Sequence, residues 1–138
     1  MKVEVTPNEF NPWASLQVYE NSFVRGKCGA VATFVGTMRD EGETVQSMFL
    51  EHYPGMTEKY LHSISETALQ RWEILDTLII HRVGEMQPGD TIVLVAAWAA
   101  HRAPAFEACR FLIEQLKSKA QFWKRESLDE GDRWVETN

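Results

Sequence analysis

Two lysines, Lys117 and Lys124, lie on either side of a predicted helix–strand junction and could hold an anion together. They belong to the segment KSKAQFWKRE, which runs from Lys117 to Glu126. An α-helix turns by about 100° per residue, so with Phe106 as the reference of its apolar face, Lys117 falls about 20° away. A lysine beside a buried stripe is costly unless its ammonium meets an anion or reaches water. This spacing therefore suggests an anionic ligand.

The same segment has a simpler interpretation. Lys117 could run along the apolar surface until its ammonium reaches water, and Lys124 could be a solvated lysine of an edge strand. Lys119 is turned by about 220° from Phe106 and is expected to face solvent. Spacing alone leaves a ligand site and two solvated lysines as alternatives.

Further cationic side chains follow two other predicted strands. Arg39 comes shortly after the strand Cys28–Gly36, and His101 and Arg102 follow the apolar strand Ile92–Trp98. An arginine at the start of a helix opposes the helix dipole, so a bound anion would explain its position. The alternative is that these side chains are surface residues that cap the helix or pair with carboxylates.

Other common chemistries are not indicated. The chain has no glycine-rich phosphate loop and no nucleophile elbow, and its four histidines share no ligand spacing, so neither a cofactor nor a metal is expected. His81 and Arg82 sit late in a strand, where a structural role is predicted. Cys28 and Cys109 lie 81 positions apart in apolar runs, which fits two buried thiols in a reducing compartment.

Composition and charge limit the class of partner. The chain has 138 residues, which predicts one domain over residues 1–138. Its net charge of −6 argues against nucleic-acid binding, yet residues 101–125 carry six basic and two acidic side chains, +4, which leaves −10 for the rest. Such a local basic patch suits a small anion. No signal peptide or membrane-spanning run is recognised, so a cytoplasmic protein without membrane contact is expected.

The order of predicted elements indicates an α+β fold. After a small N-terminal element it is ββαββαββ, with the second long helix from about Pro104 to Lys119. This order predicts a ferredoxin-like or hammerhead-type, mainly antiparallel sheet with two long helices. A terminal β-hairpin turns at Asp129–Asp132, and its residues Phe122, Trp123 and Trp134 offer apolar surface for self-association.

Five segments in this order resemble the large, catalytic subunit of molybdopterin synthase, and the resemblance covers Gly29 to Glu136. The segments are LEHYPGMTEK (Leu50–Lys59), HRVGEMQPGD (His81–Asp90), AAHRAPAFEAC (Ala99–Cys109), FWKRE (Phe122–Glu126) and GDRWVE (Gly131–Glu136).

The resemblance implies sulfur transfer. In that family a small ubiquitin-like subunit carries a thiocarboxylate on a C-terminal Gly-Gly and delivers its sulfur to cyclic pyranopterin monophosphate, which becomes the dithiolene of molybdopterin. It also implies a homodimer with one small subunit at each outer end, a heterotetramer. The alternative from another class is a non-catalytic module of the same fold that binds a small phosphorylated ligand or scaffolds a partner.

The resemblance also implies the roles of individual residues. Lys117 is expected to act in catalysis as acid/base or nucleophile, with Lys124 as its electrostatic partner. The substrate-binding residues that it implies are Thr37, Met38, Arg39, His101, Arg102, Lys117, Lys124, Arg125 and Glu126. A cyclic phosphate suits fixed cations, and charge that develops as its ring opens can be stabilised by an ammonium.

Overall fold

A computed structural model describes the backbone of residues 1–40, 45–119, 122–128 and 131–135, and the side chains of residues 1–40, 47–119 and 122. The elements in chain order are β1 (Lys2–Thr6), α1 (Pro12–Glu20), β2 (Ala30–Thr37), β3 (Val45–His52), α2 (Met56–Arg71), β4 (Asp76–Arg82), β5 (Gly84–Met86), β6 (Thr91–Ala99), α3 (Arg102–Lys119), β7 (Phe122–Leu128) and β8 (Gly131–Val135).

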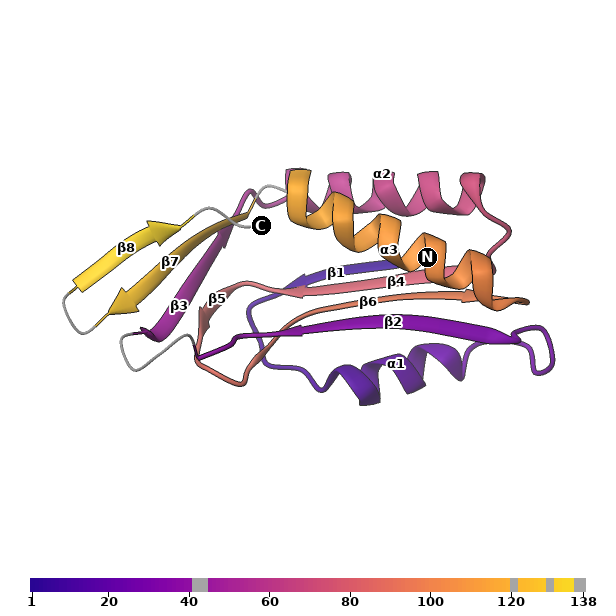
Figure 1. The fold of residues 1–138 in the computed structure, drawn as a ribbon, viewed down its shortest axis with the longest axis horizontal. Coiled ribbons are helices and arrows are strands. Elements are labelled where there is room, and N and C mark those ends of the chain that lie inside the picture. Colours follow the sequence, from indigo (N-terminus) through magenta and orange to yellow (C-terminus); the bar gives the residue numbers. More distant parts are fainter. Residues whose placement is uncertain (41–44, 120–121, 129–130, 136–138) are drawn as a thin grey trace.

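The strands form two four-stranded sheets, and the predicted α+β class is confirmed. Sheet A has the order β1-β4-β6-β2, in which only β1 and β4 run parallel. Sheet B has the order β5-β3-β7-β8 and is antiparallel throughout. Figure 1 shows α2 and α3 above sheet A, with sheet B extending from one end of it. The terminal hairpin β7–β8 is present, and residues 129 and 130 of its turn lie outside the described part of the chain.

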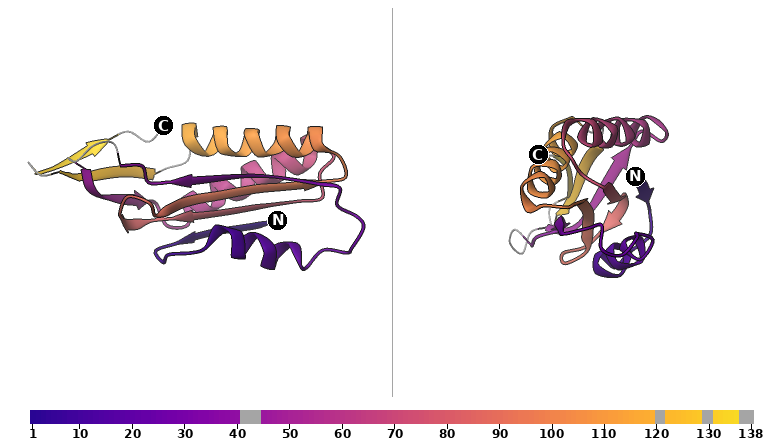
Figure 2. Two further views of the ribbon diagram at one scale, coloured as in Figure 1. Left: turned by 60° about the horizontal axis from the view of Figure 1, so that its bottom comes forward. Right: turned by 90° about the vertical axis from the view of Figure 1, so that its right-hand side faces the viewer.

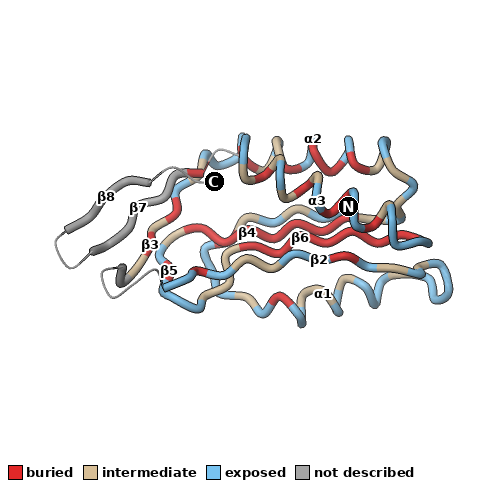
Figure 3. The backbone as a smooth tube through the Cα atoms, in the orientation of Figure 1, coloured by how far each residue is buried: buried red, intermediate tan, exposed pale blue. Residues whose placement is uncertain are grey.

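The core forms on both faces of sheet A because its central strand β6 is apolar on both sides. Residues 93–99 of this strand are all buried (Figure 3). One face packs against α2 and α3 through Val93, Val95 and Ala97. The other face turns Trp98 toward α1. Figure 2 shows from two further directions that α1 lies on the side of sheet A opposite α2 and α3. A continuous apolar run is what a strand covered on both faces requires.

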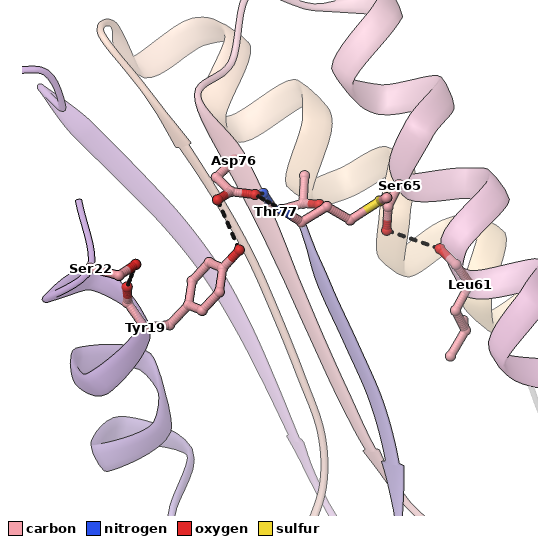
Figure 4. A network of polar contacts seen from close by, with 7 residues as sticks. Tyr19, Ser22, Leu61, Ser65, Asp76 and Thr77 are labelled. Carbon is pink, nitrogen blue, oxygen red and sulfur yellow. Dashed lines mark hydrogen bonds and ion pairs between the residues drawn. The ribbon is translucent and has the colours of Figure 1, made fainter. Parts of the chain in front are cut away.

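The helix α1 is attached to the second face of sheet A by polar contacts at its C-terminal end. Tyr19 donates its hydroxyl hydrogen to Asp76 at 2.8 Å (Figure 4), and Trp98 donates its indole N–H to Glu20 at 2.8 Å. Burial, and then the Asp76 carboxylate, raise the pKa of Tyr19. At the other end, the Asn11 side chain accepts hydrogen bonds from the backbone N–H groups of Trp13 and Ala14, as an N-cap should.

The sequence pattern predicts that Phe106 marks the buried face of α3, and this prediction was wrong. Phe106 is 66% exposed. The buried residues of α3 are Ala105, Ala108, Cys109, Leu112 and Leu116. The period of the apolar pattern was correct, but the tight packing of small residues against sheet A turns the helix so that Phe106 faces away. Lys117 is half-buried at the edge of this face and Lys119 is exposed, as predicted.

Three further differences concern boundaries and surfaces. The helix α3 begins at Arg102, because Pro104 is tolerated in a first turn, where no helical N–H bond is lost. The short strand β5 was not predicted. Phe122 is buried rather than exposed, while the side chains of Trp123 and Trp134 lie outside the described set. None of the described helices is long and apolar enough to cross a membrane.

Candidate anion site at the junction of the two sheets

Lys117 lies in the last turn of α3 and is half-buried beside His81 of β4. His81 is 3% exposed, and its Nδ1 lies 2.8 Å from the backbone oxygen of Arg82. The pKa of His81 is lowered to about 3, chiefly by burial; the bond to the Arg82 carbonyl opposes this shift, and electrostatic interactions with Lys117 and His52 add to it. The imidazole is therefore neutral near pH 7. Because a carbonyl only accepts, Nδ1 carries the proton and Nε2 keeps a lone pair.

The aromatic ring of Phe122 fixes the start of β7 against this histidine. The Phe122 and His81 ring centroids are 3.9 Å apart with an interplanar angle of 16°. His52 lies 6.5 Å from the same ring and pairs with Phe122 in the sheet. Lys124 follows Phe122 by two residues, about 6.7 Å along a strand, and pairs with Leu50. The backbone thus carries Lys124 to the corner that holds Lys117.

The segment Thr37–Arg39 reaches the same corner from β2. Met38 is 5% exposed and belongs to one apolar cluster with Phe122. Thr37 and Arg39, on either side of it, are exposed. Met38 therefore faces the core, and its side chain is not exposed for the substrate contact expected of it. The predicted residues Arg125 and Glu126 follow in β7, and their side chains, like that of Lys124, lie outside the described set.

His101 and Arg102 are far from this corner within one chain. Both are exposed at the start of α3, and Arg102 precedes Lys117 by 15 residues, a rise of about 22 Å. A single chain thus places Lys117 near His81 and the start of β7, and Met38 in the same apolar cluster as Phe122. It leaves the His101–Arg102 pair at the opposite end of the helix.

The sequence predicts structural roles for His81 and Arg82, and both side chains are buried. Their position at the border of the site was not predicted. The available signal was HRVGEMQPGD, in which this His-Arg pair precedes the Pro88-Gly89 turn. Over the described residues, no group of three or more His, Cys, Asp or Glu side chains is placed to hold a metal ion.

These features define an α+β protein with a cationic corner where α3 and β4 end and β7 begins. Comparison with known proteins identifies the family. The chain belongs to the MoaE protein family, whose pattern matches residues 6–119.

Two curated relatives show the extent of the similarity. The molybdopterin synthase catalytic subunit of Ralstonia nicotianae is 54% identical over 114 residues, which span 81% of this chain and 65% of that relative. The molybdopterin synthase catalytic subunit of Escherichia coli K12 is 46% identical over 98% of this chain and 89% of its own length.

Solved structures agree with this fold. The molybdopterin biosynthesis MoaE protein from Burkholderia ambifaria has a TM-score of 0.84 at 43% identity and covers 99% of this chain and 89% of its own. A complex of subunits 1 and 2 of the molybdopterin-converting factor from Helicobacter pylori has a TM-score of 0.84 over 96% of this chain and 89% of its own. At 19% identity, that second likeness concerns the fold alone.

Proposed function

We propose that this chain is the catalytic subunit of a molybdopterin synthase. It moves sulfur from the C-terminal thiocarboxylate of a small ubiquitin-like partner to cyclic pyranopterin monophosphate, and two transfers form the dithiolene of molybdopterin. Membership of the MoaE family and relatives that are named catalytic subunits support this function. They also favour it over the alternative, a non-catalytic module that binds a phosphorylated ligand or scaffolds a partner.

The observation that carries the proposal is the convergence of the end of α3 with the start of β7. Lys117 acts electrostatically on His81, and His81 stacks on Phe122, two residues before Lys124. An anionic substrate at this corner would meet two lysines from different elements. A scaffold needs neither of them.

The residue types suit the chemistry. Lys117 is partly desolvated, so it can exchange a proton with the substrate or attack it, and Lys124 can stabilise developing negative charge. Arg39 is suited to hold a phosphate through its guanidinium, with Thr37 close to it in the chain. Arg125 and Glu126 complete the expected contacts from β7.

A second copy of the chain would supply the His101–Arg102 pair. Relative to Phe106 and at about 100° per residue, Arg102, Ile113 and Lys117 all fall within about 40° and form one stripe along α3. Phe111 lies on the opposite side of the helix, where it contacts Trp72 beside α2. The stripe therefore faces away from α2.

This stripe overlies the open edge of sheet A. β2 is the last strand of that sheet, and α3 packs over β2 and β6. Phe34 of β2 and Phe106 of α3 are 37% and 66% exposed. Two copies joined through this side by a twofold axis would set their α3 helices antiparallel, with Arg102 of one copy near Lys117 of the other. Each site of the homodimer would then use both copies.

The small sulfur-carrier subunit would bind at each outer end of this homodimer and complete a heterotetramer. The Helicobacter pylori structure is a complex of two different subunits, and its fold likeness is in keeping with such a pairing. Within the described chain both cysteines, Cys28 and Cys109, are free thiols, which is compatible with the proposed cytoplasmic location.

The test is reconstitution of the reaction. The purified chain is incubated with cyclic pyranopterin monophosphate and the thiocarboxylated partner, and the product is identified by the mass of two added sulfur atoms. The matched control is the same partner with an ordinary C-terminal carboxylate. Substrate binding without any sulfur gain would favour the non-catalytic module instead.

A further inference from the structure

A charged pair links the last residue of β4 to the residue that directly precedes β6. Arg82 is 8% exposed, its Nη1 lies 3.2 Å from Oδ2 of Asp90, and its Nη2 donates to the Glu85 carbonyl at 2.9 Å. The same Asp90 oxygen accepts the backbone N–H of Gln87 at 2.9 Å. The Asp90 carboxylate therefore contacts both the Arg82 side chain and the backbone of the turn that precedes Asp90.

This turn is bonded directly to the segment that carries Arg39. Met38 donates its backbone N–H to the Asp90 carbonyl at 2.8 Å, and Gly89 donates to the Met38 carbonyl at 2.7 Å. Gly89 has a φ of 93°, a backbone conformation that other residues rarely adopt, so the turn favours glycine here.

The two backbone hydrogen bonds to Met38 take the place of regular strand pairing between β2 and β6. The pairing of β2 with β6 shifts its register between Gly36 and Thr37, where the edge strand leaves sheet A. Beyond that point Met38 is held by residues 89 and 90 of the turn. Because Met38 points into the core, its backbone determines how its exposed neighbours Thr37 and Arg39 are aimed.

We propose that the Arg82–Asp90 pair is a positioning device for the substrate-binding segment Thr37–Arg39. The inference rests on the proposed function, in which Arg39 holds the anionic group of the substrate. Arg82 and Asp90 touch no substrate. They fix the turn, the turn fixes Met38, and Met38 fixes the direction of Arg39. Small misplacement of a binding group is enough to weaken catalysis.

The first test removes the negative charge of Asp90 and keeps the shape of its side chain. Asp90→Asn retains an oxygen for the Gln87 N–H but loses the ionic contact with Arg82. The expected result is a rise in KM for cyclic pyranopterin monophosphate on the order of 10-fold, with kcat changed by less than about 3-fold, as for loss of uniform substrate binding. Glu4→Gln, in the exposed Lys2–Glu4 pair, is the matched control and should leave both constants unchanged.

A double-mutant comparison separates positioning from a general loss of stability. If Asp90 acts through Arg39, Asp90→Asn should add no further loss to an Arg39→Ala chain. Losses that multiply in the double variant would overturn the proposal. Should Asp90→Asn fail to fold, Arg82→Lys serves instead, because it keeps the charge and removes one of the two guanidinium contacts.

The last measurement does not depend on sulfur transfer. Hydrogen exchange of the Met38 and Gly89 amides, followed by NMR in the full chain, should accelerate at least 10-fold in Asp90→Asn and remain unchanged in Glu4→Gln. Unchanged exchange in Asp90→Asn would overturn the positioning role. Absence of sulfur transfer by the wild-type chain would instead refute the proposed function, and the exchange rates would still decide whether the pair holds this segment.

Discussion

Arg102 and Lys117 stand on the same side of one helix but about 22 Å apart, because 15 residues of α3 separate them. Neither side chain can span that distance. A pocket that needs both must therefore draw them from two copies of the chain.

Mixing two inactive variants tests this arrangement. Arg102→Ala and Lys117→Ala chains should each be poorly active alone, whereas a mixture with random subunit exchange should regain about a quarter of wild-type activity. Half of the dimers are then hybrids, and each hybrid has one intact site of two. Activity no higher than that of either parent would exclude a site shared between copies.

The two lysines at the end of α3 offer a matched pair for the catalytic assignment. Lys117→Ala should lower the rate of sulfur transfer on the order of 10²–10³-fold, which is typical for loss of a transition-state charge contact. Lys119→Ala, on an exposed residue two positions away, should be close to neutral. Both should keep their thermal unfolding midpoints, since neither truncation opens a core cavity. Equal losses of rate in the two variants would remove Lys117 from its assigned role.

Acid should destabilise the fold through His81. Its pKa is about 3 in the folded chain, well below the ordinary value of 6.5, so between these limits only the unfolded chain takes up the proton. Stability is thus complete above about pH 6.5 and falls by about 1.4 kcal/mol per pH unit below it. Lys117 and His52 both act electrostatically on the ring.

The matched variant is His81→Phe, which keeps an aromatic ring against Phe122. Urea unfolding at several pH values from 7.5 to about 4.5 should show a shallower decline in the free energy of unfolding for this variant. Parallel curves for the variant and the wild type would show that the acid sensitivity originates elsewhere.

The two cysteines should differ in reactivity. Burial raises the pKa of the Cys109 thiol to about 11, and its side chain lies against β6 in the core. Cys28 is half-buried at the entrance to β2. Iodoacetamide at pH 8 should therefore modify Cys28 alone in the native chain and both thiols in urea, as read by peptide mass. Rapid native labelling of a Cys28→Ser chain would contradict this assignment.

Elements with a strong local signal were predictable from the sequence. The continuous apolar run of β6 and the long helix α3 appear in the structure close to where they were expected. The division into two sheets was not predictable, because it depends on which strands pair over long distances. The strand β5 has only three residues and carries no pattern of its own.

For the site, the sequence revealed candidates but not their grouping. Met38 and Phe122 lie far apart in the sequence yet share one apolar cluster, a long-range arrangement that no local pattern encodes. The assumed phase of α3 failed for a related reason. A period fixes the spacing of buried residues, whereas packing against the sheet decides which face is buried.

The order of sheet A has a consequence for synthesis on the ribosome. β1 pairs with β4, and both β2 and β4 pair with β6, so the sheet lacks its central strand until Ala99 has emerged. Until then β2 has no partner in the sheet, and β1 can pair only with β4. Such non-local pairing slows folding and exposes strand edges to association. Nascent chains stalled before β6 should therefore be the ones that chaperones retain.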